Sequence, residues 1–294
     1  MFKRGSGQSP EERTTMKLTY YGTAAAEGFP GIFCECEFCK RARALGGKNL
    51  RSRSQALVDG ELLIDFPPDT LYHVYAFGLP LHKIKNLIVT HSHADHLYER
   101  DFSQRKETYA YFDGEEFPLN VYGSMPTVDK ISSAIQQAGA AKQKRWELFE
   151  FTPYKMHKIG NHEVTPLKAW HDFRTLPYVY DIKNAEGKRM LYSNDTGFYP
   201  DETWQYLEQN KPYYNLVSLD CTGGIIDIDY DCHMNFKMNL EMRERLLKIG
   251  VADEKTIFVS HHFSHNGGAV YDDFAPVAAK EGFLLSYDGM EIEF

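Results

Sequence analysis

The chain lacks any apolar run long enough to cross a membrane as a helix. Its N-terminus, MFKRGSGQSPEERTTMKLTYYG, is polar and contains no apolar stretch of the kind that signal peptides carry. Repeats and low-complexity linkers are also missing from the sequence. We therefore expect no membrane association, interpret residues 1–15 as a flexible leader, and predict a single domain over residues 16–294.

An excess of positive charge is missing too. The chain has 33 lysines and arginines against 41 aspartates and glutamates, which gives a formal net charge of -8. This balance argues against a nucleic-acid partner, although a small phosphate substrate in a metal-lined pocket stays compatible with it. The run KRARALGGKNLRSRS contains Arg41, Arg43, Arg51 and Arg53, and we expect most of these to form a solvated face.

Cysteine is scarce, and its arrangement excludes a disulfide framework. There are five cysteines, an odd number, and three of them crowd into CECEFC at Cys34, Cys36 and Cys39. This usage favours a reducing cytoplasm and a metal-binding role for the cluster. A closed structural zinc site needs a fourth ligand. Because Cys221 and Cys232 are far away in the sequence, either a histidine supplies that ligand or the site stays open.

The sequence has the material for a large core, with 43% hydrophobic and 14% aromatic residues. Alternating patterns predict hairpins in the first half, and strand–helix units follow them. The pattern favours an α/β fold of two sheets with helices outside. The last residues, FLLSYDGMEIEF, are predicted to form a closing hairpin. Residues 101–118 have no clean periodicity and are interpreted as a loop over the site or as a surface insertion.

The stretch THSHADH is the strongest chemical signal. It places His91, His93, Asp95 and His96 within six residues, directly after a short apolar strand. On an extended segment His91 and His93 point the same way, whereas Asp95 and His96 follow at the turn and can face a second point. Imidazoles and carboxylates suit zinc, manganese and iron, and the sequence does not distinguish among them. The stretch therefore predicts two neighbouring metal sites and supplies about half of the ligands of each.

Further ligands are expected at other strand ends. The candidates are His171 in AWHDF, Asp195 in YSNDTG and one of the three histidines in SHHFSH. Asp172, next to His171, is expected to hold an imidazole by a hydrogen bond.

The stretch HSHADH matches the H-x-H-x-D-H signature of the metallo-β-lactamase superfamily, so the chain resembles that superfamily from about Met16 onward. The resemblance implies a four-layer αβ/βα sandwich with a dinuclear metal site at the open edges of two sheets. It also implies the ligands of that site. One metal would take His91, His93 and His171, the second Asp95, His96 and one late histidine, and Asp195 would bridge them.

A C-x-C-x-x-C run before that signature is similar to the PhnP-like branch of the superfamily, which hydrolyses a cyclic ribose phosphodiester. This resemblance implies a structural zinc held by three cysteines and a histidine three residues after the last active-site histidine. The stretch HFSH offers that spacing, with His262 as the metal ligand and His265 as the zinc ligand. His261 should then face away from His262 and pack or support a ligand. Choosing His261 as the ligand would break the three-residue offset.

The branch also carries a catalytic histidine between the positions matched by Asp195 and His262, which implies His233 as the proton donor to the leaving group. Asp95 would orient a metal-bound hydroxide. We therefore expect a metal-dependent hydrolase of a small or cyclic phosphodiester. The alternatives are a nuclease, an ester, thioester or lactone hydrolase, and a non-catalytic or redox metal protein. The sequence leaves a homodimer open and does not identify substrate-binding residues.

Overall fold

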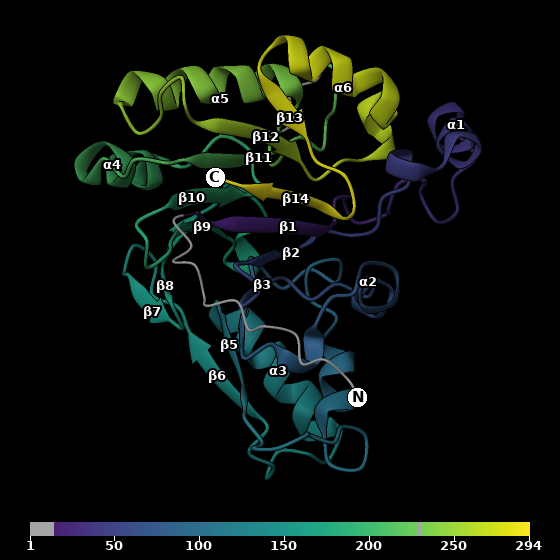
Figure 1. Ribbon diagram of the computed structural model, residues 1–294, viewed down its shortest axis with the longest axis vertical. Helices are drawn as coiled ribbons and strands as arrows, with labels where there is room; N and C mark the ends of the chain where they lie inside the picture. Colours follow the sequence, from purple (N-terminus) through teal and green to yellow (C-terminus); the bar gives the residue numbers. More distant parts are fainter. Residues whose placement is uncertain (1–14, 228–230) are drawn as a thin grey trace, which may run out of the picture.

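The computed structural model describes residues 15–227 and 231–294, and the fourteen strands of these residues form two seven-stranded sheets (Figure 1). The first sheet has the order β14-β1-β2-β3-β4-β5-β6, and the second has the order β13-β12-β11-β10-β9-β8-β7. The strands of the first sheet are β1 (Lys17–Gly22), β2 (Gln55–Val58), β3 (Leu62–Ile64), β4 (Asn86–Ile88), β5 (Leu119–Gly123), β6 (Trp146–Glu150) and β14 (Met290–Glu293). Those of the second are β7 (His157–Ile159), β8 (His162–Lys168), β9 (Tyr178–Lys183), β10 (Arg189–Ser193), β11 (Leu216–Asp220), β12 (Ile257–His261) and β13 (Phe283–Leu285).

Helices lie on the outer faces of both sheets, so that the molecule has four layers, and one helix, residues 37–45, lies at the side of the sandwich (Figure 1). The α-helices of the described ranges are α1 (Glu37–Leu45), α2 (Thr70–Phe77), α3 (Met125–Gln137), α4 (Asp201–Asn210), α5 (Phe236–Ile249) and α6 (Tyr271–Lys280). Apolar residues of α3 pack on the first sheet, and those of α4, α5 and α6 pack on the second. This is the αβ/βα sandwich that the sequence resemblance implied.

A shared core joins the inner faces of the two sheets. It contains Leu18 and Ile64 from the first sheet and Val164, Ile182 and Leu216 from the second, all with at most 1% of their surface exposed. Burying such a side chain fully stabilises a fold by roughly 1.5–3 kcal/mol. Along each strand these residues alternate with residues that point to the other side of the sheet. One side of the sheet therefore faces the shared core, and the other faces the helices. The core therefore fixes the sheets against each other.

Strand direction brings the chemically active residues to one edge. Strands β10, β11, β12 and β13 run parallel, and so do β3, β4, β5 and β6. The carboxyl ends of parallel strands meet at the same edge of a sheet. The segments that follow β4, β8, β10 and β12 carry the histidines and aspartates singled out above.

The predicted closing hairpin is wrong. Strand β13 joins the second sheet beside β12, and β14 joins the first sheet beside β1, so the chain crosses between the sheets at residues 286–289. Polar contacts hold this crossing segment. Ser286 Oγ lies 3.0 Å from His261 Nδ1, and Asp288 accepts hydrogen bonds from Thr23 and Ser52. These long-range contacts outweigh the local turn signal of Asp288 and Gly289.

Residues 101–118 form a surface segment packed beside α3 and the first sheet. It includes a 3-10 helix, η3 (Glu99–Arg105), whose Phe102 is buried in the core under α3. The Arg105 guanidinium donates to the backbone oxygens of Phe117 and Arg145, at 2.6 and 3.0 Å. Of the two interpretations left open by the sequence, these contacts favour the surface insertion.

The basic run is only partly solvated. Arg41 and Arg43 are exposed, as expected, but Arg51 has 6% of its surface exposed and donates to Thr23 Oγ1 and Ser286 O. Arg53 pairs with Asp69 at 3.0 Å. The reason is that the segment after residue 50 enters the interior beside Phe29 and the end of β1.

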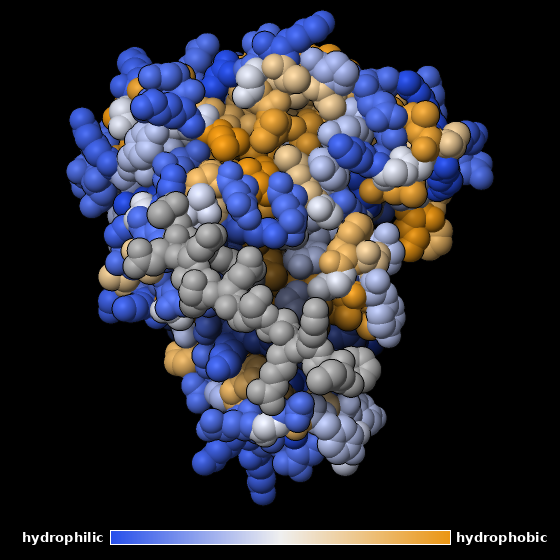
Figure 2. Space-filling view, in the orientation of Figure 1, coloured by the Kyte–Doolittle hydropathy of each residue, from blue (hydrophilic) through white to orange (hydrophobic). Residues whose placement is uncertain are grey.

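The surface seen in Figure 2 is mostly hydrophilic, with apolar patches in its upper half and at the right-hand edge near α1. Over the parts of the chain that the structure describes, no helix has both the length and the apolar character needed to span a bilayer.

Candidate metal centre

Seven of the predicted ligands converge in two overlapping groups at the edge of the sheets. Every ligand atom within a group lies within 4.8 Å of the others, and Asp195 belongs to both groups. One group consists of His91, His93, His171 and Asp195, and the other of Asp95, His96, Asp195 and His262.

The hydrogen bonds behind the rings determine which nitrogen faces the centre. In the second group, His96 Nδ1 lies 2.7 Å from Asp65 Oδ2, and His262 Nδ1 lies 2.9 Å from Thr222 Oγ1. Thr222 donates its own hydrogen to Asp220, so it accepts from His262. Both Nδ1 atoms therefore carry a ring hydrogen, so that Nε2 of each neutral ring would present a lone pair to the centre.

The first group is arranged in the same way. His91 Nδ1 faces Thr90 Oγ1 at 3.1 Å, and His171 Nδ1 faces the backbone oxygen of Cys232 at 3.3 Å. His93 is turned the other way, with Nε2 3.2 Å from Asp172 Oδ2 and Nδ1 toward the centre. The sequence predicted that Asp172 holds an imidazole, and the structure shows that this imidazole is His93. Adjacent residues on an extended segment point to opposite sides, so Asp172 does not face its neighbour His171.

The inward-facing lone pairs fit a cation better than they fit one another. His93 Nδ1 lies 2.9 Å from His91 Nε2 and 3.2 Å from His171 Nε2, and His96 Nε2 lies 3.2 Å from His262 Nε2. Without a hydrogen between them such nitrogens repel, whereas a divalent ion would bind them all.

Asp195 gives a second indication of a cation. Its side chain is buried, with 3% of its surface exposed, and Oδ1 makes no regular hydrogen bond, although His233 Nδ1 lies 3.1 Å from it. Its Oδ2 lies 3.2 Å from His91 Nε2 and 3.1 Å from His96 Nε2. Burial opposes the charged form, but the surrounding histidines, first His262, lower the pKa of Asp195 well below its ordinary value. A buried, charged carboxylate that both ligand groups share fits a bridging position.

The backbone is strained at three of these strand ends. Asp65, Asp195 and His262 have φ values of 65°, 55° and 63°, in the left-handed region that side chains with a Cβ rarely adopt. Such conformations concentrate at functional sites, where the surrounding structure holds them in place.

His233 lies beside the two groups. Its Nδ1 is 3.1 Å from Asp195 Oδ1 and 3.2 Å from Asp220 Oδ2. Burial lowers the pKa of His233, but the Asp220 carboxylate outweighs burial and raises it to about 9. A protonated imidazole next to the centre can donate a proton to a leaving group.

Asp65 and Asp220 support the centre but were not singled out from the sequence. Asp65 follows β3 directly and is bonded by His96 and Thr90, and Asp220 ends β11. Each is an acidic residue at the end of a strand, on the edge of the sheets where the ligand groups lie. The same position at a strand end is what indicated Asp195 in the sequence. Applying that signal to every strand would have found both.

His261 lies in the interior between the sheets. It is fully buried, and its ring nitrogens face Ser54 Oγ at 2.8 Å and Ser286 Oγ at 3.0 Å. Burial lowers its pKa well below the ordinary value, so the ring is neutral. The side chain packs and bonds inside the molecule and does not belong to either ligand group.

The cysteine cluster forms a third group, in which Cys34, Cys36, Cys39 and His265 have ligand atoms within 4.8 Å of one another. His265 Nδ1 lies 3.7 Å from Cys34 Sγ and 3.6 Å from Cys36 Sγ, and its Nε2 faces Glu27 at 3.6 Å. Gly31 leaves room for this arrangement, because a Cβ there would lie 3.1 Å from His265 Cδ2. Three sulfurs and one imidazole nitrogen are a fitting set for zinc.

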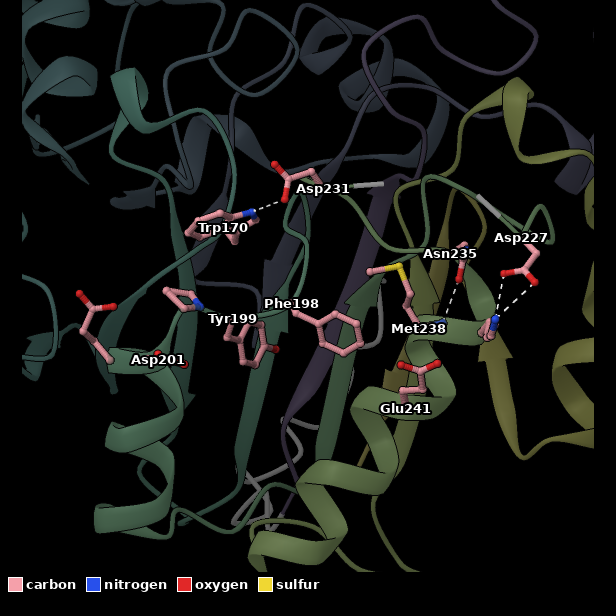
Figure 3. Close-up of a pocket in the computed structure, with 12 residues that line it drawn as sticks. Trp170, Phe198, Tyr199, Asp201, Asp227, Asp231, Asn235, Met238 and Glu241 are labelled. Carbon is pink, nitrogen blue, oxygen red and sulfur yellow. Dashed lines mark hydrogen bonds and ion pairs between the residues drawn. The ribbon is translucent and has the colours of Figure 1, made fainter. Parts of the chain in front are cut away.

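A groove of about 830 Å³ lies near the centre, between the N-terminal ends of α4 and α5 (Figure 3). Trp170, which precedes His171, donates its indole N–H to Asp231 at 3.0 Å. Five acidic side chains and the apolar Phe198 and Met238 share the lining with Lys237 and Asn235. The acids are Asp201, Glu202, Asp227, Asp231 and Glu241.

Comparison with known proteins places this arrangement in a family. The profile of the beta-lactamase superfamily domain matches residues 62–259. The chain belongs to the β-lactamase superfamily. The matched range contains both ligand groups except His262, and the superfamily is one of hydrolases.

Individual relatives are distant. Ribonuclease Z of Pyrococcus abyssi (strain GE5 / Orsay) is 24% identical over 163 residues, which are 52% of this chain and 50% of that protein. The match therefore spans about half the length of this curated relative. A new diphosphatase from the PhnP family has a similar fold, with a TM-score of 0.71 and 19% identity over 95% of this chain and 98% of the other. Zn(2+)-bound PqqB from Methylobacterium extorquens gives a TM-score of 0.67 and 16% identity over 95% and 100%.

Proposed function

We propose that the protein is a metal-dependent phosphodiesterase that hydrolyses a small or cyclic phosphodiester. The observation that carries the proposal is the pair of ligand groups that share Asp195, with His233 within 3.1 Å of that residue. Two divalent ions, when bound, would supply a hydroxide near neutral pH and would neutralise charge on the phosphoryl group. The donor set suits manganese, zinc or iron.

The chain's own residues would have separate tasks. His91, His93 and His171 would hold one ion, Asp95, His96 and His262 would hold the other, and Asp195 would contact both. Asp95 would also orient the attacking oxygen. His233 would protonate the leaving alkoxide, and Asp220 would keep His233 in position and charged.

The third ligand group would hold a structural zinc. In this proposal Cys34, Cys36, Cys39 and His265 tie the loop before α1 to the segment that follows β12. Because His265 lies three residues after His262, the zinc would fix the backbone that carries one of the active-site ligands. Support for a PhnP-like enzyme comes from this cluster and from the fold of the PhnP-family diphosphatase.

A nuclease is the second candidate, and the match with Ribonuclease Z favours it specifically. The groove beside the centre argues for a small substrate instead. Its five carboxylates are opposed by Lys237 alone among the basic residues that line it, and Lys237 pairs with Asp227 at 3.1 Å. A chain of phosphates running along this groove would be repelled.

The first test is hydrolysis of bis(p-nitrophenyl) phosphate, p-nitrophenyl phosphate, a simple lactone and a single-stranded oligonucleotide, with manganese present. We expect the diester to be cleaved in clear preference to the other three. Preference for the oligonucleotide would favour the nuclease, and activity on the lactone alone would overturn the phosphodiesterase. If no substrate reacts, metal analysis decides. About three ions per chain are expected of the proposed hydrolase, whereas one zinc alone would indicate a non-catalytic protein.

A further inference from the structure

Cys232 lies beside the candidate centre, although it belongs to neither of the two ligand groups there. Its sulfur, one ring nitrogen of His171 and one of His233 lie within 4.8 Å of one another. Cys232 and His233 are both partly exposed, so dissolved ions can reach them. The proposed reaction gives the thiol of Cys232 no task. A thiol and imidazoles are, however, a suitable donor set for a soft divalent ion, and zinc is the commonest such ion in proteins.

His233 is held in the way that metal-binding histidines are held. Its Nδ1 lies 3.2 Å from Asp220 Oδ2, just as Nδ1 of His96 lies 2.7 Å from Asp65 Oδ2 in the second ligand group. A carboxylate behind one ring nitrogen fixes the ring and leaves the other nitrogen as the ligand atom. Nε2 of His233 can therefore bind a cation while Nδ1 keeps its contact with Asp220.

His171 is the third member of the cluster, but both of its nitrogens are engaged. Nε2 faces the first ligand group, 3.2 Å from His93 Nδ1, and Nδ1 faces the backbone oxygen of Cys232 at 3.3 Å. The cation would thus be held by Cys232 Sγ and His233 Nε2, with solvent completing its shell. Two protein ligands bind zinc less tightly than the four of the cysteine cluster, so this position would fill only when zinc is in excess.

The surroundings of the cluster are negatively charged. Asp195 Oδ1 and Asp220 Oδ2 lie 3.1 and 3.2 Å from His233 Nδ1. Asp231, directly before Cys232, lines the acidic groove and accepts a hydrogen bond from the Trp170 indole (Figure 3). Carboxylates that line a groove raise the local concentration of cations. The groove therefore favours divalent ions next to Cys232.

We propose that Cys232 and His233 form an inhibitory zinc site at the rim of the candidate centre. A zinc ion there would occupy Nε2 of His233, so that this nitrogen could no longer carry the hydrogen that the leaving alkoxide needs. The ion replaces the hydrogens of the thiol and of the ring nitrogen, and both pass to solvent as protons. Manganese prefers carboxylates to thiolates and should not bind here. The inhibitory role rests on the proposed function, whereas the binding of the ion does not.

The first experiment measures binding with cadmium, a soft ion whose bond to a thiolate absorbs ultraviolet light. Full-length protein loaded with manganese and zinc is titrated with cadmium, and the bound metals are counted. We expect about one further cadmium per chain, with a thiolate band, in the wild type and in the control variant Cys221→Ala. Cys232→Ala should lack both the band and the additional ion, and His233→Ala should bind cadmium more weakly.

The same samples separate the new site from exchange at the other sites. Cadmium that replaces zinc at Cys34, Cys36 and Cys39 gives a thiolate band in every variant. The difference between the wild type and Cys232→Ala therefore reports the new site alone. Equal bands in these two proteins would overturn the proposal. Release of manganese in step with cadmium uptake would show exchange at the candidate centre and would overturn it as well.

The second experiment tests inhibition. Hydrolysis of a diester with an alkyl leaving group is followed with manganese present while the free zinc concentration rises, and each protein is compared with its own rate before zinc is added. We expect zinc to inhibit the wild type. Cys232→Ala should need at least about tenfold more free zinc, because even the loss of a partner that supports a ligand weakens metal binding roughly 10–100-fold.

The choice of substrate separates the possible causes of inhibition. Bis(p-nitrophenyl) phosphate should be inhibited much less, since its leaving group needs no proton. Inhibition of the wild type and Cys232→Ala at the same zinc concentration would exclude the inhibitory role. If neither diester is hydrolysed in any sample, the proposed function fails, and the cadmium titration still decides whether the site exists.

Discussion

At the scale of the residue, Asp220 organises the neighbourhood of the candidate centre. Its carboxylate accepts hydrogen bonds from the backbone nitrogens of Asp195, Thr222 and Met234, and faces His233 Nδ1. These contacts hold Asp220 ionised. Because Asp220 is buried, where the dielectric constant is low, its charge acts strongly on the neighbouring His233 ring. The consequence is a histidine that stays protonated at neutral pH, as a proton donor requires.

We expect His233→Ala to lower turnover roughly 10²–10⁴-fold on a diester with an alkyl leaving group, since an alkoxide needs a proton to leave. The loss on bis(p-nitrophenyl) phosphate should be much smaller, because p-nitrophenolate leaves without one. Metal content should not change. The measurement is kcat on both substrates together with metal analysis. Equal losses on both would show that His233 positions groups without donating a proton, and no loss on either would exclude it from the reaction.

Single residues were predictable where the chemistry is local. The spacing in HSHADH depends only on the alternation of an extended chain, so the convergence of His91, His93, Asp95 and His96 followed from the sequence. The partner of Asp172 did not, because it depends on how η4 (Phe173–Thr175) turns the side chain toward His93. The burial of Arg51 did not follow from the sequence either, since it results from contacts with residues far away in the chain.

At the scale of the element, helix α1 begins inside the cysteine cluster. Cys36 is its N-cap, with Sγ accepting from the backbone nitrogen of Cys39, and Glu37 lies in the first turn. Burial opposes the thiolate, but hydrogen bonds, first from the Cys39 backbone, lower the pKa of Cys36 to about 7. Cysteine is not a usual N-cap residue, which is why the sequence pattern did not predict this helix.

We expect Cys36→Ala to remove one zinc per chain and to destabilise the protein, because the loop before α1 would lose its link to His265. The two active-site ions should remain. The matched control is Cys221→Ala, which removes a buried thiol outside the three ligand groups and should leave the zinc in place. Metal analysis and thermal unfolding measure both effects. Unchanged zinc in Cys36→Ala would contradict the assignment.

Elements were predictable where their partners are near in sequence, as in the Asp59–Gly60 turn between β2 and β3. The last two strands were not, since both sheets offer an open edge to the chain after Leu285, and local turn residues do not indicate which one is used. Helix α2 was missed because its first turn follows two prolines and its apolar residues show little periodicity.

At the scale of the whole molecule, the centre depends on two sheets that the chain builds separately. Ligands come from the ends of β4 in the first sheet and of β8, β10 and β12 in the second. The shared core between the sheets sets the distance between these ends. The division into a leader and a single domain over 16–294 stays a prediction, and unfolding experiments can test it.

We expect Ile182→Ala, in the shared core, to reduce the free energy of unfolding by about 2–5 kcal/mol through lost burial and the cavity left behind. Leu284→Ala is the control, because Leu284 is 42% exposed and its replacement should cost about 0.5 kcal/mol or less. Denaturant unfolding followed by two spectroscopic probes should give one coincident transition, shifted in Ile182→Ala. Two separate transitions would contradict the single domain.

The pairing of β1 with β14 has a consequence for how the protein is made. Strand β1 begins at Lys17, whereas its partner β14 begins only at Met290.

 Thr19 and Glu291, which face each other across these two strands, are thus 272 positions apart in the chain. During synthesis the edge of β1 stays unpaired until the ribosome has released almost all of the described sequence. Contacts this distant in sequence form slowly, and an open strand edge invites pairing with other chains. The nascent protein therefore passes through its period of greatest aggregation risk late, and chaperone binding to the β1 edge would matter most just before its last strand emerges.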